Sequence, residues 1–162
     1  MIELTHIDVD NLRRLAARKP VDFGGVAVSA GALPPRHVAV RALTHLDAGT
    51  PALWCMPFLI MPRSHDAILG GCTFKTAPVD GRVEIGYGVA PSHRGRGVAT
   101  AAVTQLLHLA AASGIVRQVI AHVLPGNFAS AKVLSRLGFE MGSAFVDTDE
   151  EEVVRWMWHV AR

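Results

Sequence analysis

A short stretch of arginines and glycines in the middle of the chain has the residue types that bind an anion. Residues 93–100 read His-Arg-Gly-Arg-Gly-Val-Ala-Thr, and an apolar segment with helical spacing follows. Gly95 and Gly97 let backbone N–H groups approach a phosphate closely, and Arg94 and Arg96 add positive charge. A turn that opens a helix also presents unpaired N–H groups at the positive end of the helix dipole. The stretch therefore predicts a site for a pyrophosphate.

Three classes of cofactor compete for such a turn. A Walker-type nucleotide site needs Gly-Lys-Ser/Thr after the loop, and the chain has none. A dinucleotide site needs a third glycine where Thr100 stands, and it needs an acidic residue about 20 positions further on. Residues 117–124 supply no acid. A coenzyme A ester is left as the best candidate.

The charges are distributed unevenly along the chain. The net charge is only +2, which gives no general case for nucleic acid as a partner. No Asp or Glu lies between Glu84 and Glu140, whereas residues 147–152 are mostly acidic. The basic region suits an anion. The acidic cluster could attract a cationic amine, or it could be a solvated turn.

Hydrophobic periodicity predicts the elements that position this turn. Strands are expected where short apolar runs lie between turn residues, and helices where apolar residues recur every three or four positions. The expected strands are 1–8, 52–61, 67–76, 82–90, 116–124, 139–146 and 153–160, and the expected helices are 11–17, 37–46, 97–113 and 128–137, with a loop over 21–35.

The length and composition indicate one globular α/β domain over residues 1–162. The longest apolar run, 52–61, is interrupted by Pro57 and is about half of the ~20 residues that cross a bilayer. No secretory signal is visible, and Cys55 and Cys72 lack metal-ligand spacing. A cytoplasmic location, buried thiols and no membrane partner are expected.

Two ordered motifs resemble the GNAT superfamily of acyl-CoA N-acyltransferases. The family signature Gln/Arg-x-x-Gly-x-Gly/Ala is matched by residues 94–99, after a strand-like segment 84–91. A second family motif is matched by residues 127–139, Asn-Phe-Ala-Ser-Ala-Lys-Val-Leu-Ser-Arg-Leu-Gly-Phe. Its Asn-x-x-Ser form is closest to the RimJ/RimL-like branch, whose members modify protein N-termini or small amines.

The resemblance implies a mixed, largely antiparallel sheet of about six to seven strands flanked by about four helices. It implies an acyltransferase that moves an acetyl group from acetyl-CoA to a primary amine, on a small molecule or a peptide N-terminus, by direct attack in a ternary complex. The backbone turn would hold the pyrophosphate, and the preceding strand would pair with pantetheine. The implied cofactor-binding residues are Tyr87, Gly88, Val89, Arg94, Gly95, Arg96, Gly97, Val98, Ala99, Thr100 and Asn127.

The catalytic groups are less clear from the sequence. A base is useful because an alkylamine with a pKa of about 10.4 is mostly protonated at pH 7. Glu84, on the cofactor strand, is the candidate, and a salt-bridged strand glutamate is the alternative. Relatives often carry a tyrosine that protonates the thiolate, but Leu134 occupies that position. Ser130 is the candidate acid, with Ser135 and water as alternatives.

Other residues are interpreted as structural. Strand alternation should place Tyr87, the only tyrosine, on the sheet face opposite Glu84, where packing is expected. His122 is interpreted as a hydrogen-bonded core residue. Asn127 could cap a helix as well as contact pantetheine. No motif for a metal exists. A non-catalytic acyl-CoA sensor with the same fold is the alternative function, a nucleotide-binding module is a weaker one, and a homodimer is left open.

Overall fold

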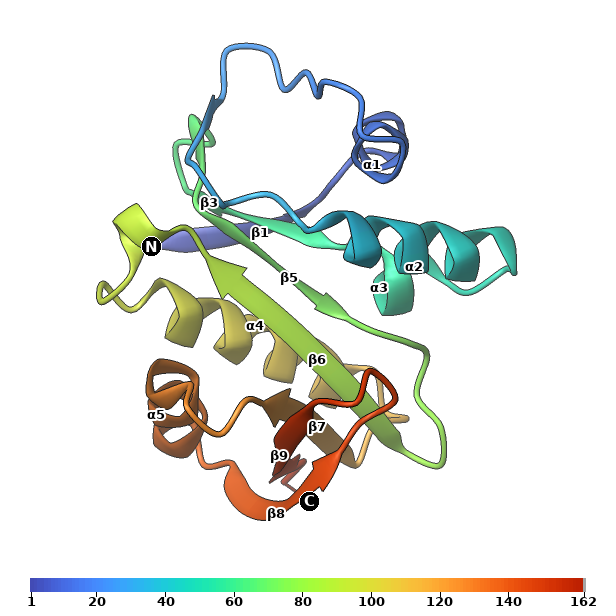
Figure 1. Ribbon diagram of the computed structural model, residues 1–162, viewed down its shortest axis with the longest axis vertical. Helices are drawn as coiled ribbons and strands as arrows, with labels where there is room; N and C mark the ends of the chain where they lie inside the picture. Colours follow the sequence, from blue (N-terminus) through green and yellow to red (C-terminus); the bar gives the residue numbers. More distant parts are fainter. Residues whose placement is uncertain (162) are drawn as a thin grey trace.

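The computed structural model describes residues 1–161 and contains one seven-stranded sheet flanked by helices (Figure 1). The strand order across the sheet is β1-β3-β5-β6-β7-β9-β8, and β2 and β4 form a separate two-stranded ribbon. The elements in chain order are β1 (Ile2–His6), α1 (Val9–Ala16), β2 (Ala27–Val28), α2 (Arg36–Asp47), α3 (Ala52–Cys55), β3 (Phe58–Pro62), β4 (Ala67–Ile68), β5 (Gly70–Phe74), β6 (Arg82–Val89), the 3-10 turn η1 (Pro91–His93), α4 (Val98–Ala112), β7 (Gln118–Val123), α5 (Phe128–Arg136), β8 (Glu140–Val146) and β9 (Glu152–His159).

The sheet opens between its two central strands. β6 and β7 pair in parallel only from Arg82↔Gln118 to Ile85↔Ala121. The rest of β6, residues 86–89, pairs with β5 alone. All other neighbours in this sheet are antiparallel. The far half of β6 therefore has one edge without a partner strand, and this edge leads into η1 and α4.

Helices cover both faces of the sheet, with α1 and α2 at the upper right of Figure 1 and α4 and α5 at the lower left. Strand alternation sorts β3 between the two layers: Phe58 and Ile60 belong to the cluster around α4, and Leu59 and Met61 belong to the cluster under α1 and α2. Burial of each such side chain contributes about 1.5–3 kcal/mol. The neighbouring strand β6 contributes Val83, Ile85 and Val89 to the cluster around α4.

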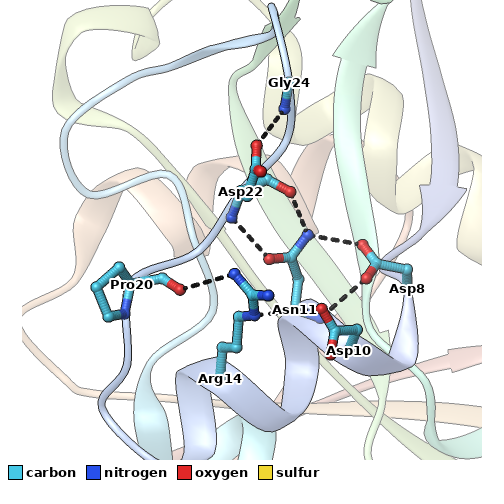
Figure 2. A network of polar contacts seen from close by, with 7 residues as sticks. All are labelled: Asp8, Asp10, Asn11, Arg14, Pro20, Asp22 and Gly24. Atoms are coloured by element: carbon cyan, nitrogen blue, oxygen red, sulfur yellow. Dashed lines mark hydrogen bonds and ion pairs between the residues drawn. The ribbon is translucent and has the colours of Figure 1, made fainter.

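A polar network fixes the path from α1 toward α2 (Figure 2). Asn11 is buried, and its side-chain amide donates to Asp8 Oδ1 at 2.9 Å and to the Asp22 carbonyl at 2.7 Å. Its Oδ1 accepts the Asp22 N–H at 2.9 Å. Asp8 also caps α1 through Oδ2 and the Asn11 N–H. This network pins the start of the loop that precedes α2.

The expected fold class is confirmed, with three local differences. The expected strand 52–61 is split into α3 and β3, because Pro51 lies at the N-cap of a helical turn and Pro57 follows it. The helices therefore number five within residues 1–161 instead of about four. The expected loop 21–35 contains the two-residue strand β2, which pairs with β4. Among the described residues, no helix is long and apolar enough to cross a membrane.

Candidate functional site

The turn between β6 and α4 has an exposed row of backbone donors. Gly95 and Gly97 adopt φ values of +73° and +77°, which favour glycine, and Gly97 is the N-cap of α4 without a side-chain cap. Within residues 1–161, the N–H groups of residues 95–100 make no turn or capping hydrogen bond. Such donors, at the positive end of a 15-residue helix, have the arrangement that suits an anion.

Five of these six residues, all except Arg96, line a cavity of about 840 Å³, here called the anion cavity. Its basic side chains come from the turn and from α5. No Asp or Glu side chain among the described residues lines it. The lining residues are Tyr87, Gly88, Val89, His93, Arg94, Gly95, Gly97, Val98, Ala99, Thr100, Leu124, Gly126, Asn127, Ala129, Ser130, Lys132, Val133 and Arg136.

The structure brings together all the cofactor-binding residues predicted from the sequence except one. The Arg96 side chain is exposed and does not line the anion cavity, because it leaves the turn toward solvent. Lys132 and Arg136 on α5 supply charge there instead. Arg94 Nε donates to the Val89 carbonyl at 3.2 Å, on the unpaired end of β6. Asn127 Oδ1 accepts the Ser130 N–H at 3.1 Å, so its capping role is observed.

A second cavity of about 420 Å³, here called the central cavity, continues from the first. The two cavities share Tyr87, Gly88, Val89, Arg94, Leu124, Asn127 and Ser130. Gly86 and Gly88 of β6 line the central cavity, together with residues of α2. A Cβ atom at Gly88 would meet nothing within 4 Å, and one at Gly86 would lie 3.1 Å from Lys75 Cε. The missing side chains leave a channel along β6.

Two hydroxyl groups meet where the cavities join. Tyr87 Oη lies 2.6 Å from Ser130 Oγ, so the tyrosine bridges β6 and α5. Burial raises the pKa of Tyr87, and the Ser130 hydrogen bond partly opposes this shift. Leu134 is fully buried, and Ser135 is exposed and lines neither cavity. Ser130 is therefore the serine that the structure places at the site.

Glu84 lies on the opposite face of β6 from Tyr87, within a network of basic groups. Its Oε2 is 2.6 Å from Lys75 Nζ and 3.2 Å from His122 Nδ1. Only a quarter of the Glu84 side chain is exposed, and the residue stands behind the wall that Lys75 and His122 contribute to the central cavity. The salt-bridged glutamate weighed from the sequence is what the structure shows, and Oε1 has no partner among the described residues.

His122 was missed as a site residue. The Arg155 guanidinium donates to His122 Nε2 at 3.2 Å, and Nδ1 faces Glu84, so the two contacts fit a neutral ring with its proton on Nδ1. Burial lowers the pKa of His122, and the positive charges of Arg155 and Lys75 lower it further, against the attraction of Glu84. On β7, His122 has the same facing as Glu84, because Glu84 pairs with Ile120. The sequence alone does not give this register.

The described residues contain no group of three or more His, Cys, Asp or Glu side chains that could hold a metal ion. The arrangement instead joins an anion site, a channel along an open strand edge, a pair of hydroxyls and a partly shielded carboxylate. These parts suit the binding of a long phosphorylated thioester and an acid–base reaction at its end.

Comparisons with known proteins agree with this geometry. The family described as acetyltransferase (GNAT) domain matches residues 27–140. The uncharacterized N-acetyltransferase p20 of Bacillus licheniformis is 34% identical over 84 residues, which are 51% of this chain and 47% of that protein. The chain thus spans about half the length of the curated relatives it matches.

Solved structures show the same fold over nearly the whole chain. RimL, a ribosomal L7/L12 alpha-N-protein acetyltransferase, is 20% identical with a TM-score of 0.66, covering 98% of this chain and 93% of its own. A GNAT superfamily phosphinothricin acetyltransferase from Sinorhizobium meliloti, in complex with AcCoA, is 19% identical with a TM-score of 0.67, covering 99% and 89%. The family match over most of the sequence means that this chain belongs to the GNAT acetyltransferase domain family.

Proposed function

We propose that this protein is an N-acetyltransferase that transfers an acetyl group from acetyl-CoA to a primary amine in a ternary complex. The observation that carries the proposal is the row of unpaired N–H groups at residues 95–100. It opens onto a channel that continues past the Tyr87–Ser130 pair to the wall in front of Glu84. Family membership and the solved relatives support the same reaction.

The residues of the anion cavity fit coenzyme A. The N–H groups of residues 95–100 would bind the pyrophosphate, with Arg94, Lys132 and Arg136 adding charge. The unpaired edge of β6 at residues 87–89 would accept hydrogen bonds from pantetheine in place of a strand. Arg94, now on the Val89 carbonyl, would turn toward the phosphates.

Acetyl-CoA, when bound, supplies the acetyl group as a thioester. The amine nitrogen forms a bond to the acetyl carbon, and the bond from that carbon to sulfur breaks. Glu84 takes the proton from the amine through a water, because its free Oε1 lies behind the cavity wall. Lys75 and His122 hold this carboxylate in place.

Ser130 gives a proton to the departing thiolate and regains one from solvent water, while the Tyr87 phenol keeps its own proton. A thiol with a pKa near 8.5 is a tolerable leaving group, so only modest help is needed. Burial raises the pKa of Tyr87, which keeps the phenol protonated and able to hold Ser130 in place. Tyr87 is thus a cofactor-contacting residue that also positions the acid.

A non-catalytic acyl-CoA sensor is the second candidate. Leu134, where relatives often have a proton-donating tyrosine, is fully buried and has no group that can donate a proton. The Tyr87–Ser130 pair favours catalysis over this alternative because it supplies hydroxyls from another direction.

Two measurements test the proposal. Acetyl-CoA at a hundredfold excess over its Kd should stabilise the protein by about 2.7 kcal/mol, which raises the melting temperature by roughly 5–10 °C for a chain of this size. Thiol release should then depend on an added amine. A melting shift without turnover across a broad amine panel would favour the sensor, and no shift would contradict both.

We also propose that residues 1–162 act as one cytoplasmic catalytic domain whose partners are acetyl-CoA and an amine, with no nucleic acid. The continuous sheet, the two buried free cysteines and the small net charge support this. The homodimer left open by the sequence is tested by light scattering on the purified chain.

A further inference from the structure

Helix α2 forms the far wall of the central cavity, in a region where the sequence shows no motif. Arg41 follows His37 by four positions and Val38 by three, so the three residues share one helical face, and all three line the cavity. Lys75, directly after β5, and His122 on β7 line the same space. The wall facing the open edge of β6 is therefore basic.

Arg41 is the group in this wall that lacks a partner. Its side chain is half-buried, and burial lowers the pKa of the guanidinium, against a weaker attraction by Glu84. Within residues 1–161 it makes no ion pair and no hydrogen bond. Lys75, in contrast, is paired with Glu84 at 2.6 Å. A planar guanidinium with free donors binds a carboxylate through two parallel hydrogen bonds.

The charge balance of the cavity favours an anion. No Asp or Glu side chain of the described chain lines it. The nearest carboxylate, Glu84, is already shared between Lys75 and His122. The acidic cluster 147–152 covers the turn between β8 and β9 and the first residue of β9, and it contributes nothing to the lining. A polyamine would bring further positive charge to a site with an excess of it.

We propose that the acceptor is a small amine that also carries an anionic group, of the amino-acid type, and that Arg41 binds this group. The inference rests on the proposed function, because it names the substrate class of the same site. The cavity of about 420 Å³ also has to hold the acyl end of the cofactor, which leaves room for a molecule of amino-acid size. The carboxylate on Arg41 would orient the amine toward the acetyl group.

The test compares matched pairs of amines with the purified protein. Free amino acids are assayed beside their amides, together with peptides with acidic N-termini and spermidine. Amino acids should exceed their amides in kcat/KM by about 10- to 100-fold, the range for a hydrogen bond to a charged group. In Arg41→Ala this preference should disappear through KM, and Arg41→Lys should keep part of it. Arg13→Ala removes an exposed arginine on α1 that lines neither cavity, and it is the matched control.

Binding is measured separately from turnover, as the melting shift that each amine adds to the coenzyme A complex. If anionic amines raise the melting temperature of the wild-type complex but not that of Arg41→Ala, the inference is supported. If no amine is turned over in the same experiment, the proposed catalysis is contradicted while the inference about binding stands. Equal or better binding and turnover of amides or spermidine would overturn the inference while leaving the acetyltransferase proposal standing. Preference for acidic peptides over free amino acids would also overturn it.

Discussion

The two cavities that meet at Tyr87 and Ser130 are built in different ways. The anion cavity depends on main-chain N–H groups from six consecutive residues, 95–100, and its shape follows from two glycines with positive φ. The central cavity depends on side chains from separate elements: Arg41 on α2, Lys75 after β5 and His122 on β7. The donors of the anion cavity come from one continuous stretch of sequence. The side chains of the central cavity are distant in sequence and come together only in the folded sheet.

This difference has a functional consequence. A site made of main-chain N–H groups needs glycines at fixed positions, and it suits a cofactor that all members of a family share. A wall of side chains can change residue by residue, so acceptor choice can vary without disturbing the cofactor site. Substitutions in the two regions should accordingly separate cofactor affinity from turnover and acceptor affinity.

The largest effect is expected from Gly97→Val. A β-branched residue at φ +77° is strained, and the turn would lose the shape that aims several N–H groups at the pyrophosphate. Acetyl-CoA affinity, measured by calorimetry, should fall about 100-fold or more. Gly114→Val is the control, since Gly114 has φ +74° and open surroundings but lies beyond the other end of α4. It should lower stability by about 1–2 kcal/mol and keep the affinity. Equal losses of acetyl-CoA affinity in Gly97→Val and Gly114→Val would contradict a specific role for the turn at residues 95–100.

Glu84→Gln should affect the reaction at the central cavity and leave the anion cavity intact. Turnover at neutral pH should fall about 100-fold, the lower end of the range for loss of a general base, while acetyl-CoA affinity is kept. The control Glu140→Gln changes an exposed glutamate at the start of β8. Unchanged turnover in Glu84→Gln would restrict this carboxylate to a structural ion pair with Lys75.

A smaller effect is expected at the junction of the cavities. Ser130→Ala and Tyr87→Phe should each lower kcat about 10-fold, and the double variant should lose little more, because the two hydroxyls act as one unit. Ser135→Ala, on the exposed side of α5, should have wild-type kcat. Fully additive losses in the double variant would show that the hydroxyls act independently.

The smallest effect concerns stability against pH. The pKa of His122 in the folded protein is below the unfolded value of 6.5, so the unfolded chain binds more protons as the pH falls through this range. Stability should therefore decline below about pH 6.5, and His122→Asn should reduce the slope. Burial also lowers the pKa of His6, so His6 should account for part of the pH dependence that remains in His122→Asn. Urea unfolding between pH 7 and pH 5 measures this, with exposed His159→Asn as control. An unchanged slope in His122→Asn would contradict the burial of a neutral ring.

The sequence predicted the glycine turn before α4, the order of most elements and the facing of Tyr87, because these follow from local periodicity and glycine geometry. Periodicity failed at residues 52–61, where an apolar run is helical before Pro57 and extended after it. Arg96 was predicted by proximity in sequence, yet its side chain leaves the cavity, and Lys132 and Arg136 arrive from α5. Arg41, Lys75 and His122 could not be grouped in advance, because the contacts that unite them depend on strand pairing across the whole sheet.

The central claim is that the amides of residues 95–100 bind the pyrophosphate of acetyl-CoA. Hydrogen exchange of the backbone amides, measured with and without saturating acetyl-CoA, tests it most directly. Exchange at residues 95–100 should slow strongly, and exchange at residues 113–115, beyond the other end of α4, should change little. Unchanged exchange at residues 95–100 under saturation would contradict the claim.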